Sequence, residues 1–374
     1  MNLKLLNSDY YTKVLGGWLG RCIGSQLGAP LELRPYFYIR RRYRTLNNYI
    51  KNITGNEVND DEMYEIVALL TLEQYGIDFT VDQLAQAWQD RLYKLYFTAE
   101  KAALINLWRR NLRPPQTAIQ NNPYYDFIGA QMRGEIWGLI SPGCPEVATE
   151  YAKTDASISH FGEGIYGEIY IAGLIASSFF SQDSQELIPE ILHRFIPPDS
   201  LYYSIIEKCL EGHAKYSDWK LARAQLMQNW KTVRTMLRKQ AKSFKRKFIL
   251  GIPKIHEIHV LPNAGIVTLG LLYGDGDFEK SICITALCGY DTDCNTGNVG
   301  AILGVQKGAD QIPLKWKEPL GDRFNTYVRG FSERQISKIA ERIYWIGLKV
   351  IKSKCQHIQL TEGTNFSNST YPIR

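Results

Sequence analysis

Gly16-Gly17-Trp18-Leu19-Gly20-Arg21-Cys22-Ile23-Gly24, followed by Gly28-Ala29-Pro30-Leu31-Glu32, carries the strongest structural signal in this chain. Its glycines recur at four-residue steps, so a helix would carry them along one stripe, where another helix can approach closely. A phosphate-binding loop is excluded, because no strand precedes the stretch and no Gly-Lys-Ser/Thr follows it. The stretch therefore predicts a tightly packed helix over residues 10–28.

Helical periodicity continues along most of the remaining chain. Thr80 and Thr98 are expected N-caps, each with polar residues in the following turn. The other signals predict helices over residues 60–75, 80–92, 98–110, 143–153, 162–180, 185–195, 201–216, 263–273, 278–289, 294–303 and 332–352. Strand-like alternation is scarce, and residues 255–261 are its best candidate. We predict an all-α fold in a single compact multi-helix domain.

The composition indicates a globular protein with a large core. The chain has 374 residues, of which 45% are hydrophobic, enough for one large domain or two ordinary ones. We expect one domain over residues 8–352, with residues 239–262 as an insertion or flap and residues 363–374 as a loose polar tail. The longest apolar stretch, residues 169–180, is too short to span a bilayer and is interpreted as a buried core helix.

Cysteines and charge give weaker signals. Seven cysteines without CxxC spacing argue against a disulfide framework or a zinc knuckle, and they favour a reducing cytoplasm. The net charge of +6 comes largely from two basic runs, residues 40–44 and 234–247. Such runs can contact nucleic acid, membrane or phosphate-bearing ligands, but they are more often solvated helix faces. No nucleic-acid-binding signature accompanies them, so neither nucleic acid nor a membrane is the favoured partner.

Two short acidic clusters, far apart in the chain, carry the main chemical signal. They are Asn59-Asp60-Asp61 and Asp291-Thr292-Asp293-Cys294-Asn295. Adjacent carboxylates among small or apolar neighbours repel one another, and their burial is costly unless a cation lies between them. Hard ions such as Mg²⁺ or Mn²⁺ suit carboxylate, amide and hydroxyl oxygens. The alternative is helix capping, which explains one aspartate of each cluster without a metal.

Two further residues are ambiguous on their own. His160 precedes Gly162 and Gly164, which favours either a phosphate-binding corner at a helix start or a structural histidine. Glu32 follows the glycine-rich helix in a mostly apolar setting, where a lone glutamate is ordinarily a surface residue.

Taken in order, five motifs resemble those of the ADP-ribosylglycohydrolase family, which includes the dinitrogenase-reductase-activating glycohydrolases. The resemblance covers about residues 10–303. The matching segments are Gly24-Ser25-Gln26-Leu27-Gly28-Ala29-Pro30-Leu31-Glu32, Asn59-Asp60-Asp61, Ile128-Gly129-Ala130-Gln131-Met132-Arg133, Ser159-His160 and Tyr290-Asp291-Thr292-Asp293-Cys294.

The resemblance implies a compact all-α domain that holds two Mg²⁺ or Mn²⁺ ions in a central cleft. It assigns metal ligation to Asn59, Asp60, Asp61, Asp291, Asp293 and Cys294, with Glu32 as a further ligand or gating carboxylate. The implied activity is hydrolysis of a ribosyl bond by a metal-oriented water, with Asp61 or Glu32 as general base. The implied substrate-binding residues are Gly129, Met132, Arg133, His160 and Tyr166.

Departures from the family motifs keep other functions open. Ser25, Asn59 and Cys294 replace an aspartate and two threonines, and the third motif lacks its Asn-Gly. The Cys294 thiol favours softer ions than a hydroxyl does. The first hypothesis is a hydrolase acting on an ADP-ribosylated protein or a small ribosyl compound. The second is a non-catalytic nucleotide-binding or structural descendant, and the third is a nucleic-acid-associated protein acting through residues 234–247.

Overall fold

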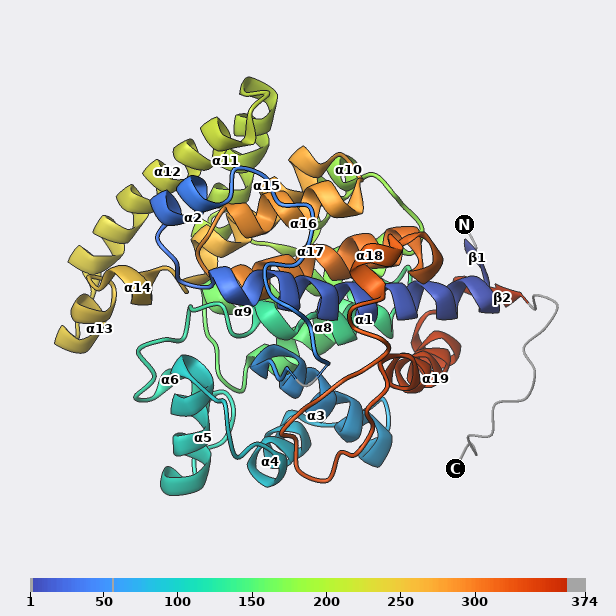
Figure 1. Ribbon diagram of the computed structural model, residues 1–374. Coiled ribbons are helices and arrows are strands. Elements are labelled where there is room, and N and C mark those ends of the chain that lie inside the picture. Colours follow the sequence, from blue (N-terminus) through green and yellow to red (C-terminus); the bar gives the residue numbers. More distant parts are fainter. Residues whose placement is uncertain (1–2, 56, 362–374) are drawn as a thin grey trace.

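The computed structural model describes residues 3–55 and 57–361, and it confirms the all-α prediction (Figure 1). The helices are α1 (Asn7–Gly28), α2 (Tyr36–Arg42), α3 (Asp60–Tyr75), α4 (Val81–Arg91), α5 (Thr98–Arg110), α6 (Gln116–Ile119), α7 (Glu135–Leu139), α8 (Pro145–Ala156), α9 (Glu163–Ser178), α10 (Ser184–Phe195), α11 (Leu201–Lys215), α12 (Trp219–Gln240), α13 (Phe244–Ile249), α14 (Pro253–His256), α15 (Val260–Gly274), α16 (Phe278–Leu287), α17 (Thr292–Lys307), α18 (Leu314–Lys317) and α19 (Ile336–Lys354). Short 3-10 turns are η1 (Ala29–Leu31), η2 (Gln131–Arg133) and η3 (Ala309–Gln311).

The glycine stripe of α1 packs against α17 at the centre of the molecule, and the two helices are antiparallel. A Cβ atom on Gly20 would lie 2.0 Å from the carbonyl oxygen of Gly300, and one on Gly24 would lie 2.1 Å from that of Thr296. The same relationship holds between Gly16 and the oxygen of Gly304, at 2.2 Å. Only glycine permits so close a backbone approach. The predicted close packing of this helix is therefore confirmed, and its partner is α17.

Other helices cover this central pair. α9, α15 and α16 pack against α17, and α19 packs against α1. In the view of Figure 1, α3, α4 and α5 lie on one side of α1, whereas α11 and α12 lie on the other. The buried hydrophobic side chains of all these elements form one continuous core. Residues 169–180 belong to it: α9 is buried along most of its length, as predicted.

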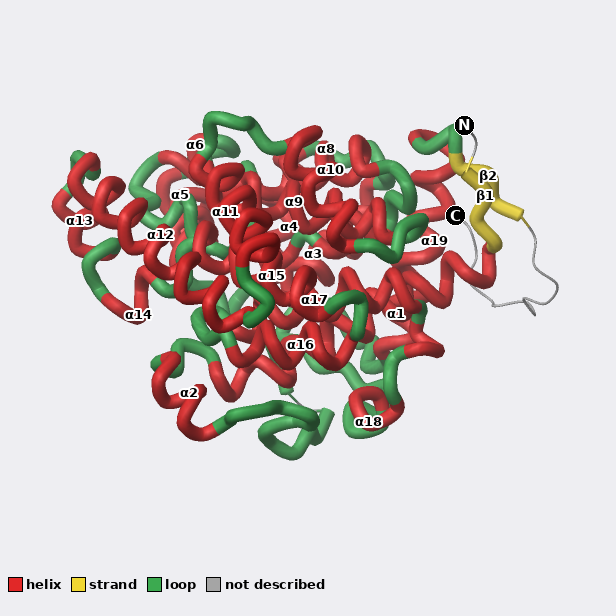
Figure 2. Tube along the Cα trace, turned by 90° about the horizontal axis from the view of Figure 1, so that it is seen from above, coloured by secondary structure: helices red, strands yellow, loops and turns green. Residues whose placement is uncertain are grey.

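The two ends of the described chain meet. β1 (Leu3–Leu6) pairs in parallel with β2 (Ile358–Thr361), with Leu3 opposite Ile358. Figure 2 shows this pair at one end of the molecule and α13 at the other. Cys144 and Cys355 form a disulfide near the strand pair, with their Cα atoms 6.1 Å apart. The five other cysteines are free and buried.

Two local predictions are wrong. Residues 255–261 do not form a strand: α14 and the start of α15 take up most of the segment, and only His259 makes an isolated bridge, to Phe127. The alternation misled because the segment joins the end of α14 to the first turn of α15, a helix that is buried on all sides and whose apolar residues follow no single face. Thr98 is the first residue of α5 rather than its N-cap, which is Phe97. Thr80, by contrast, forms the predicted cap in a complete capping box with Gln83.

The remaining domain predictions stay predictions. Residues 239–262 contain α13 and α14, and whether they act as an insertion or a flap is untested. The tail predicted over residues 363–374 lies outside the described residues. Among the helices that are described, none combines the length and hydrophobicity that crossing a membrane requires.

Candidate metal centre

Three distant segments of the chain converge beside the central helix pair. The close contact of α1 with α17 brings the end of α1 to the start of α17, where the Thr292 hydroxyl donates to the carbonyl of Gly28, at 2.8 Å. The start of α3 joins them through the Asn59 amide, whose Nδ2 donates to Asp293 Oδ2, at 2.9 Å. The fold therefore unites the two acidic clusters that are more than two hundred residues apart in the sequence.

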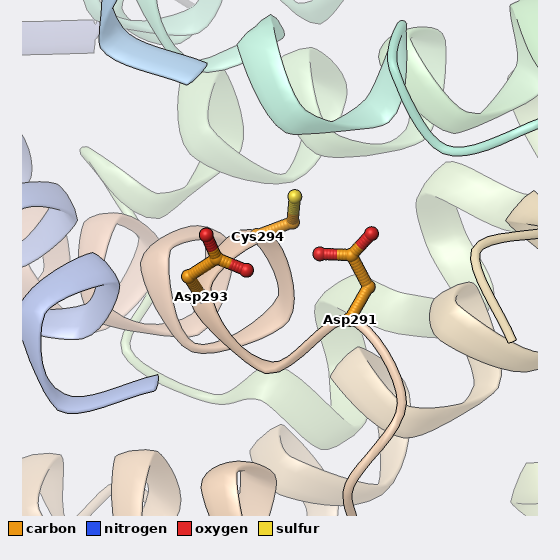
Figure 3. A group of neighbouring side chains, drawn as sticks. All are labelled: Asp291, Asp293 and Cys294. Carbon is orange, nitrogen blue, oxygen red and sulfur yellow. The ribbon is translucent and has the colours of Figure 1, made fainter. Parts of the chain in front are cut away.

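Asp291, Asp293 and Cys294 form the centre of this site. One oxygen of each carboxylate and the Cys294 sulfur lie within 4.8 Å of one another. Figure 3 shows the two carboxylates facing each other, with the thiol beside them. Asp291 is 5% exposed and Asp293 is 7% exposed, and Asp293 Oδ1 has no hydrogen-bond partner. A buried carboxylate oxygen without a partner is costly, so this geometry suits a bound cation.

The electrostatics of the site support the same conclusion. Burial, and then the charge of Asp293, raises the pKa of both Asp60 and Asp291 well above the usual range. The same two causes raise the pKa of Glu32 to about 7, although the residue as a whole is exposed. Burial and the neighbouring Asp291 also raise the pKa of the Cys294 thiol. These carboxylates destabilise one another, and a divalent cation among them would reverse that effect.

The expected ligands differ in whether other protein groups already occupy their oxygen atoms. Asn59 is the N-cap of α3, and its Oδ1 accepts from the backbone N–H of Asp61, at 2.8 Å. Asp291 occupies the N-cap position of α17, but its side chain makes no capping hydrogen bond. The capping alternative therefore accounts for Asn59 and leaves the Asp291 carboxylate available. The oxygens of Asp291 and Asp293 fit a hard cation, whereas the thiol of Cys294 adds a softer donor.

Arg21 is a buried residue beside the acidic cluster that sequence reasoning missed. It lies on α1 and is fully buried, and its Nη2 forms a short ion pair with Asp61 Oδ2. Its Nη1 lies 3.3 Å from Glu135 Oε1, and its Nε lies 3.7 Å from Glu65 Oε1. The signal in the sequence was an arginine inside a glycine-rich apolar helix, because a buried guanidinium needs carboxylate partners.

A second buried arginine organises the third motif. Arg133 pairs with Glu100 at 2.9 Å and with Asp155 at 3.2 Å, and its Nη1 also donates to the Gly129 carbonyl, at 2.6 Å. A Cβ on Gly129 would lie 1.9 Å from Glu100 Oε1, so glycine lets this carboxylate approach the backbone. All of these polar groups are satisfied within the protein. Arg133 therefore positions the Gly129 segment rather than facing a ligand.

Glu100 connects this network to the acidic cluster, and sequence reasoning treated it only as a first-turn residue. Its charge contributes to the raised pKa of Asp60, and its Oε1 lies 3.8 Å from His160 Nε2. His160 is 1% exposed, and its Nδ1 is bonded to the Ser159 hydroxyl, at 2.8 Å. Burial lowers the pKa of His160, and the charge of Arg133 lowers it further. The imidazole is therefore neutral at neutral pH, and its Nε2 has no hydrogen-bond partner.

The two remaining predicted residues lie at different places. Met132 reaches the centre, where its sulfur is 4.0 Å from the Cys294 sulfur. Tyr166 lies on α9, half-buried, with its ring edge against Tyr202. The contacts among the described residues join Met132, but not Tyr166, to the acidic cluster.

The basic run over residues 234–247 is mostly a solvated surface at the end of α12 and on α13. Its exception is Arg246, which is buried and pairs with Asp126 through Nη1, at 2.8 Å. The run borders a cavity of about 750 Å³. Lys242, Lys245 and Arg246 of the run line it together with Arg110, and no carboxylate is among its described lining residues. This cavity is basic, but it carries no nucleic-acid-binding motif.

Comparisons with known proteins identify the chain. A family model described as ADP-ribosylglycohydrolase matches residues 6–347. A solved structure described as an ADP-ribosylglycohydrolase-related protein complex has the same fold, with a TM-score of 0.59 and 14% sequence identity. The similarity covers 91% of this chain and 99% of that one. A search of curated proteins found no match.

Proposed function

Because this chain belongs to the ADP-ribosylglycohydrolase family, we propose that it is a metal-dependent glycosidase that hydrolyses a ribosyl bond. The substrate is the N- or O-glycosidic bond of an ADP-ribosylated protein or of a small ribosyl compound, and the protein acts in the cytoplasm. One observation carries the proposal. Asp293, whose buried Oδ1 has no hydrogen-bond partner, lies in a cluster with Asp291 and Cys294, where a divalent cation is the simplest partner.

The residues would hold Mg²⁺ or Mn²⁺ through Asp291 and Asp293, with Asp60, Asp61, Asn59, Cys294 and Glu32 as the other candidates from the sequence. When bound, such an ion supplies a Lewis acid that orders ribose hydroxyls and a water. Asp291 and Asp293 would fix the ion at the start of α17. The burial of the site would strengthen these charge interactions by excluding bulk solvent.

Glu32 is the better candidate for the general base. Asp61 already accepts from Arg21 and from the Cys294 thiol, so neither of its oxygens is free for a proton transfer. Glu32 is exposed at the edge of the cluster, close enough to Asp293 for the two charges to interact. Its carboxylate would take the proton of the water that attacks the anomeric carbon, and the aglycone would leave.

Fewer of the predicted substrate-binding residues than of the predicted metal ligands lie at the acidic cluster. The neutral Nε2 of His160 is a free donor or acceptor, and we assign it to the polar group of the bound nucleotide. Met132 would contact the ribose side, because its sulfur touches Cys294. Arg133 and Gly129 would act indirectly by shaping this wall, and Tyr166 would line a more distant part of the ligand site.

A panel of ribosyl substrates tests the proposal. It should include ADP-ribosyl-arginine, ADP-ribosyl-serine and free ADP-ribose derivatives, with Mn²⁺ present or removed by a chelator. We expect turnover that requires the metal and disappears in Asp291→Ala. Metal binding without turnover on the whole panel would favour the alternative of a non-catalytic nucleotide-binding or structural descendant.

The nucleic-acid hypothesis makes a separate prediction. It requires an affinity for DNA or RNA that falls steeply as salt rises, because the contacts would be with phosphates. If the protein left the electrophoretic migration of DNA and RNA unchanged at low salt, the nucleic-acid hypothesis would be wrong. The pairing of Arg246 with Asp126 and the absence of a binding motif leave it behind the hydrolase proposal.

A further inference from the structure

We infer that this chain holds one divalent cation rather than two, because the guanidinium of Arg21 takes the place of the second. The inference deepens the proposed function and rests on it. The family resemblance implies two ions, with Asn59 and Asp61 among the ligands. In this structure those two residues are already engaged by other protein groups.

Both oxygens of Asp61 have protein partners. Oδ2 forms an ion pair with Arg21 Nη2, and Oδ1 accepts from the Cys294 thiol, at 3.4 Å. Asn59 is engaged in the same way, since its Oδ1 accepts from the Asp61 N–H and its Nδ2 donates to Asp293 Oδ2. An ion at Asp61 Oδ2 would have to break the buried charge pair with Arg21, and an ion at Oδ1 would have to displace the Cys294 thiol and lie beside the guanidinium, which repels it.

Arg21 is built into the core and cannot move aside without cost. Its side chain is fully buried and lies across Gly297, where a Cβ atom would be 1.9 Å from Nη1. That nitrogen also donates to the Cys294 carbonyl, at 3.3 Å. Glu65 and Glu135 pair with the other two nitrogens of the guanidinium, Nε and Nη1. A guanidinium keeps its charge at all relevant pH values, so it is a permanent cation at this position.

The carboxylates beyond Asp61 form the remaining site. Asp293 Oδ1 has no hydrogen-bond partner, and it lies in the cluster with Asp291 and Cys294. Asp60 and Glu32 are near enough to Asp293 for their charges to interact. Asp291, Asp293 and Asp60 can surround one hard cation, with Glu32 at the edge of the site as the candidate base. The two cations of the site would then be one metal ion and one arginine.

Titration of the metal-stripped protein with Mn²⁺ tests the inference directly. We expect one ion per chain by calorimetry, and an electron paramagnetic resonance spectrum of isolated Mn²⁺ at saturation. Two ions per chain, or the spectrum of two exchange-coupled ions, would overturn the inference and leave the proposed function intact. No Mn²⁺ binding would overturn both, because the proposed function requires a metal.

Arg21→Met tests the cause. Loss of the guanidinium frees Asp61, so the folded variant should bind a second Mn²⁺ ion, and a stoichiometry that stays at one would contradict the assignment. Arg223→Met is the matched control. It removes another buried guanidinium, one that donates to the Cys288 carbonyl at 2.7 Å, and it should leave the stoichiometry at one.

Asp61→Asn keeps the test valid if Arg21→Met does not fold. An amide retains the shape of the side chain but is a poor ligand for a hard cation. With one ion held by Asp291 and Asp293, this variant should still bind one Mn²⁺ ion, with an affinity lowered by less than about tenfold, because only a neighbouring charge is lost. A loss of more than about tenfold would place Asp61 on the ion and overturn the inference.

Discussion

The carbonyl oxygen of Gly300 lies 2.0 Å from the position that a Cβ atom on Gly20 would occupy. This contact joins α1 to α17, and it sets the distance between Glu32, just beyond α1, and Asp291, just before α17. The scaffold and the candidate metal centre therefore depend on the same pair of helices. Changes on the glycine stripe should affect both.

Gly20→Ala should lower the free energy of unfolding by at least about 2 kcal/mol, because the new methyl group must push two backbones apart. Gly212→Ala is the control. Gly212 also lies in a helix, but its nearest neighbour to an added Cβ is 3.7 Å away, so the change should be neutral or stabilising by up to about 1 kcal/mol. Chemical denaturation measures both. Equal effects at the two sites would contradict the close contact.

Asp293→Asn should raise the melting temperature of the metal-free protein by about 1 °C, since about 1 kcal/mol of repulsion with Asp60 and Asp291 is relieved. The same change should abolish the rise in melting temperature that Mn²⁺ causes in the parent. Asp310→Asn, on an exposed carboxylate, should change neither value. If Asp293→Asn still responded to Mn²⁺ as the parent does, Asp293 would not be a ligand.

Glu32→Gln should lower kcat by about a hundredfold or more on the substrate that the riboside panel identifies, because the general base is lost. Mn²⁺ binding should persist. The control is Glu318→Gln, which changes an exposed carboxylate outside the two acidic clusters and should leave kcat unchanged. Loss of Mn²⁺ binding in Glu32→Gln would instead make Glu32 a ligand.

Cys294→Ser should shift the metal preference of the site. A thiolate favours soft ions, so the parent should bind Cd²⁺ more tightly than the variant does, whereas the affinity for Mg²⁺ should rise with the hydroxyl. Thiolate-to-metal charge-transfer absorption on adding Cd²⁺ reports direct ligation. Cys283→Ser, at a buried cysteine outside the cluster, should retain this absorption. Its persistence in Cys294→Ser would exclude the thiol as the ligand.

His256 should make the protein less stable in mild acid. Burial, and then the charge of Arg234, lowers its pKa from 6.5 to about 4. Between those values the unfolded chain binds the proton and the folded protein does not, so stability is full above about pH 6.5 and falls as pH drops toward 4. The slope cannot exceed about 1.4 kcal/mol per pH unit from this group.

His256→Gln should reduce the slope of unfolding free energy against pH in that range, as measured by denaturation at several pH values. His193→Gln, at an exposed histidine, should retain the parent slope. Identical slopes in all three proteins would show that His256 does not titrate differently in the folded state.

Long helices and their caps were predictable because their signals are local. The predicted helix over residues 60–75 matches α3, and Thr80 caps α4 as expected. The strand predicted over residues 255–261 failed because seven residues are too few to tell alternation from two successive helix ends, and this segment joins α14 to the buried α15. The prediction of Thr98 as an N-cap was wrong by one residue. The exact residue at which a loop becomes a helix depends on tertiary packing, which the sequence does not show.

The two acidic clusters could be recognised in the sequence, since adjacent buried carboxylates are unusual whatever the fold. Their union could not be, because it depends on α1 and α17 meeting through Gly20 and Gly300. The role of Arg21 was hidden for the same reason. Its four carboxylate partners, Asp61, Glu62, Glu65 and Glu135, come from two other helices.

The order of residues along the chain thus fixed the helices, the glycine stripe and the chemical types available for a metal site, because those follow from short-range periodicity and side-chain chemistry. Three-dimensional packing set which carboxylates face a cation and which face Arg21. Charge interactions inside a protein depend on distances of a few ångströms and on exclusion of water, and neither exists until the chain has folded. On the single-ion inference, the number of metal ions is a property of the packed core rather than of the motifs.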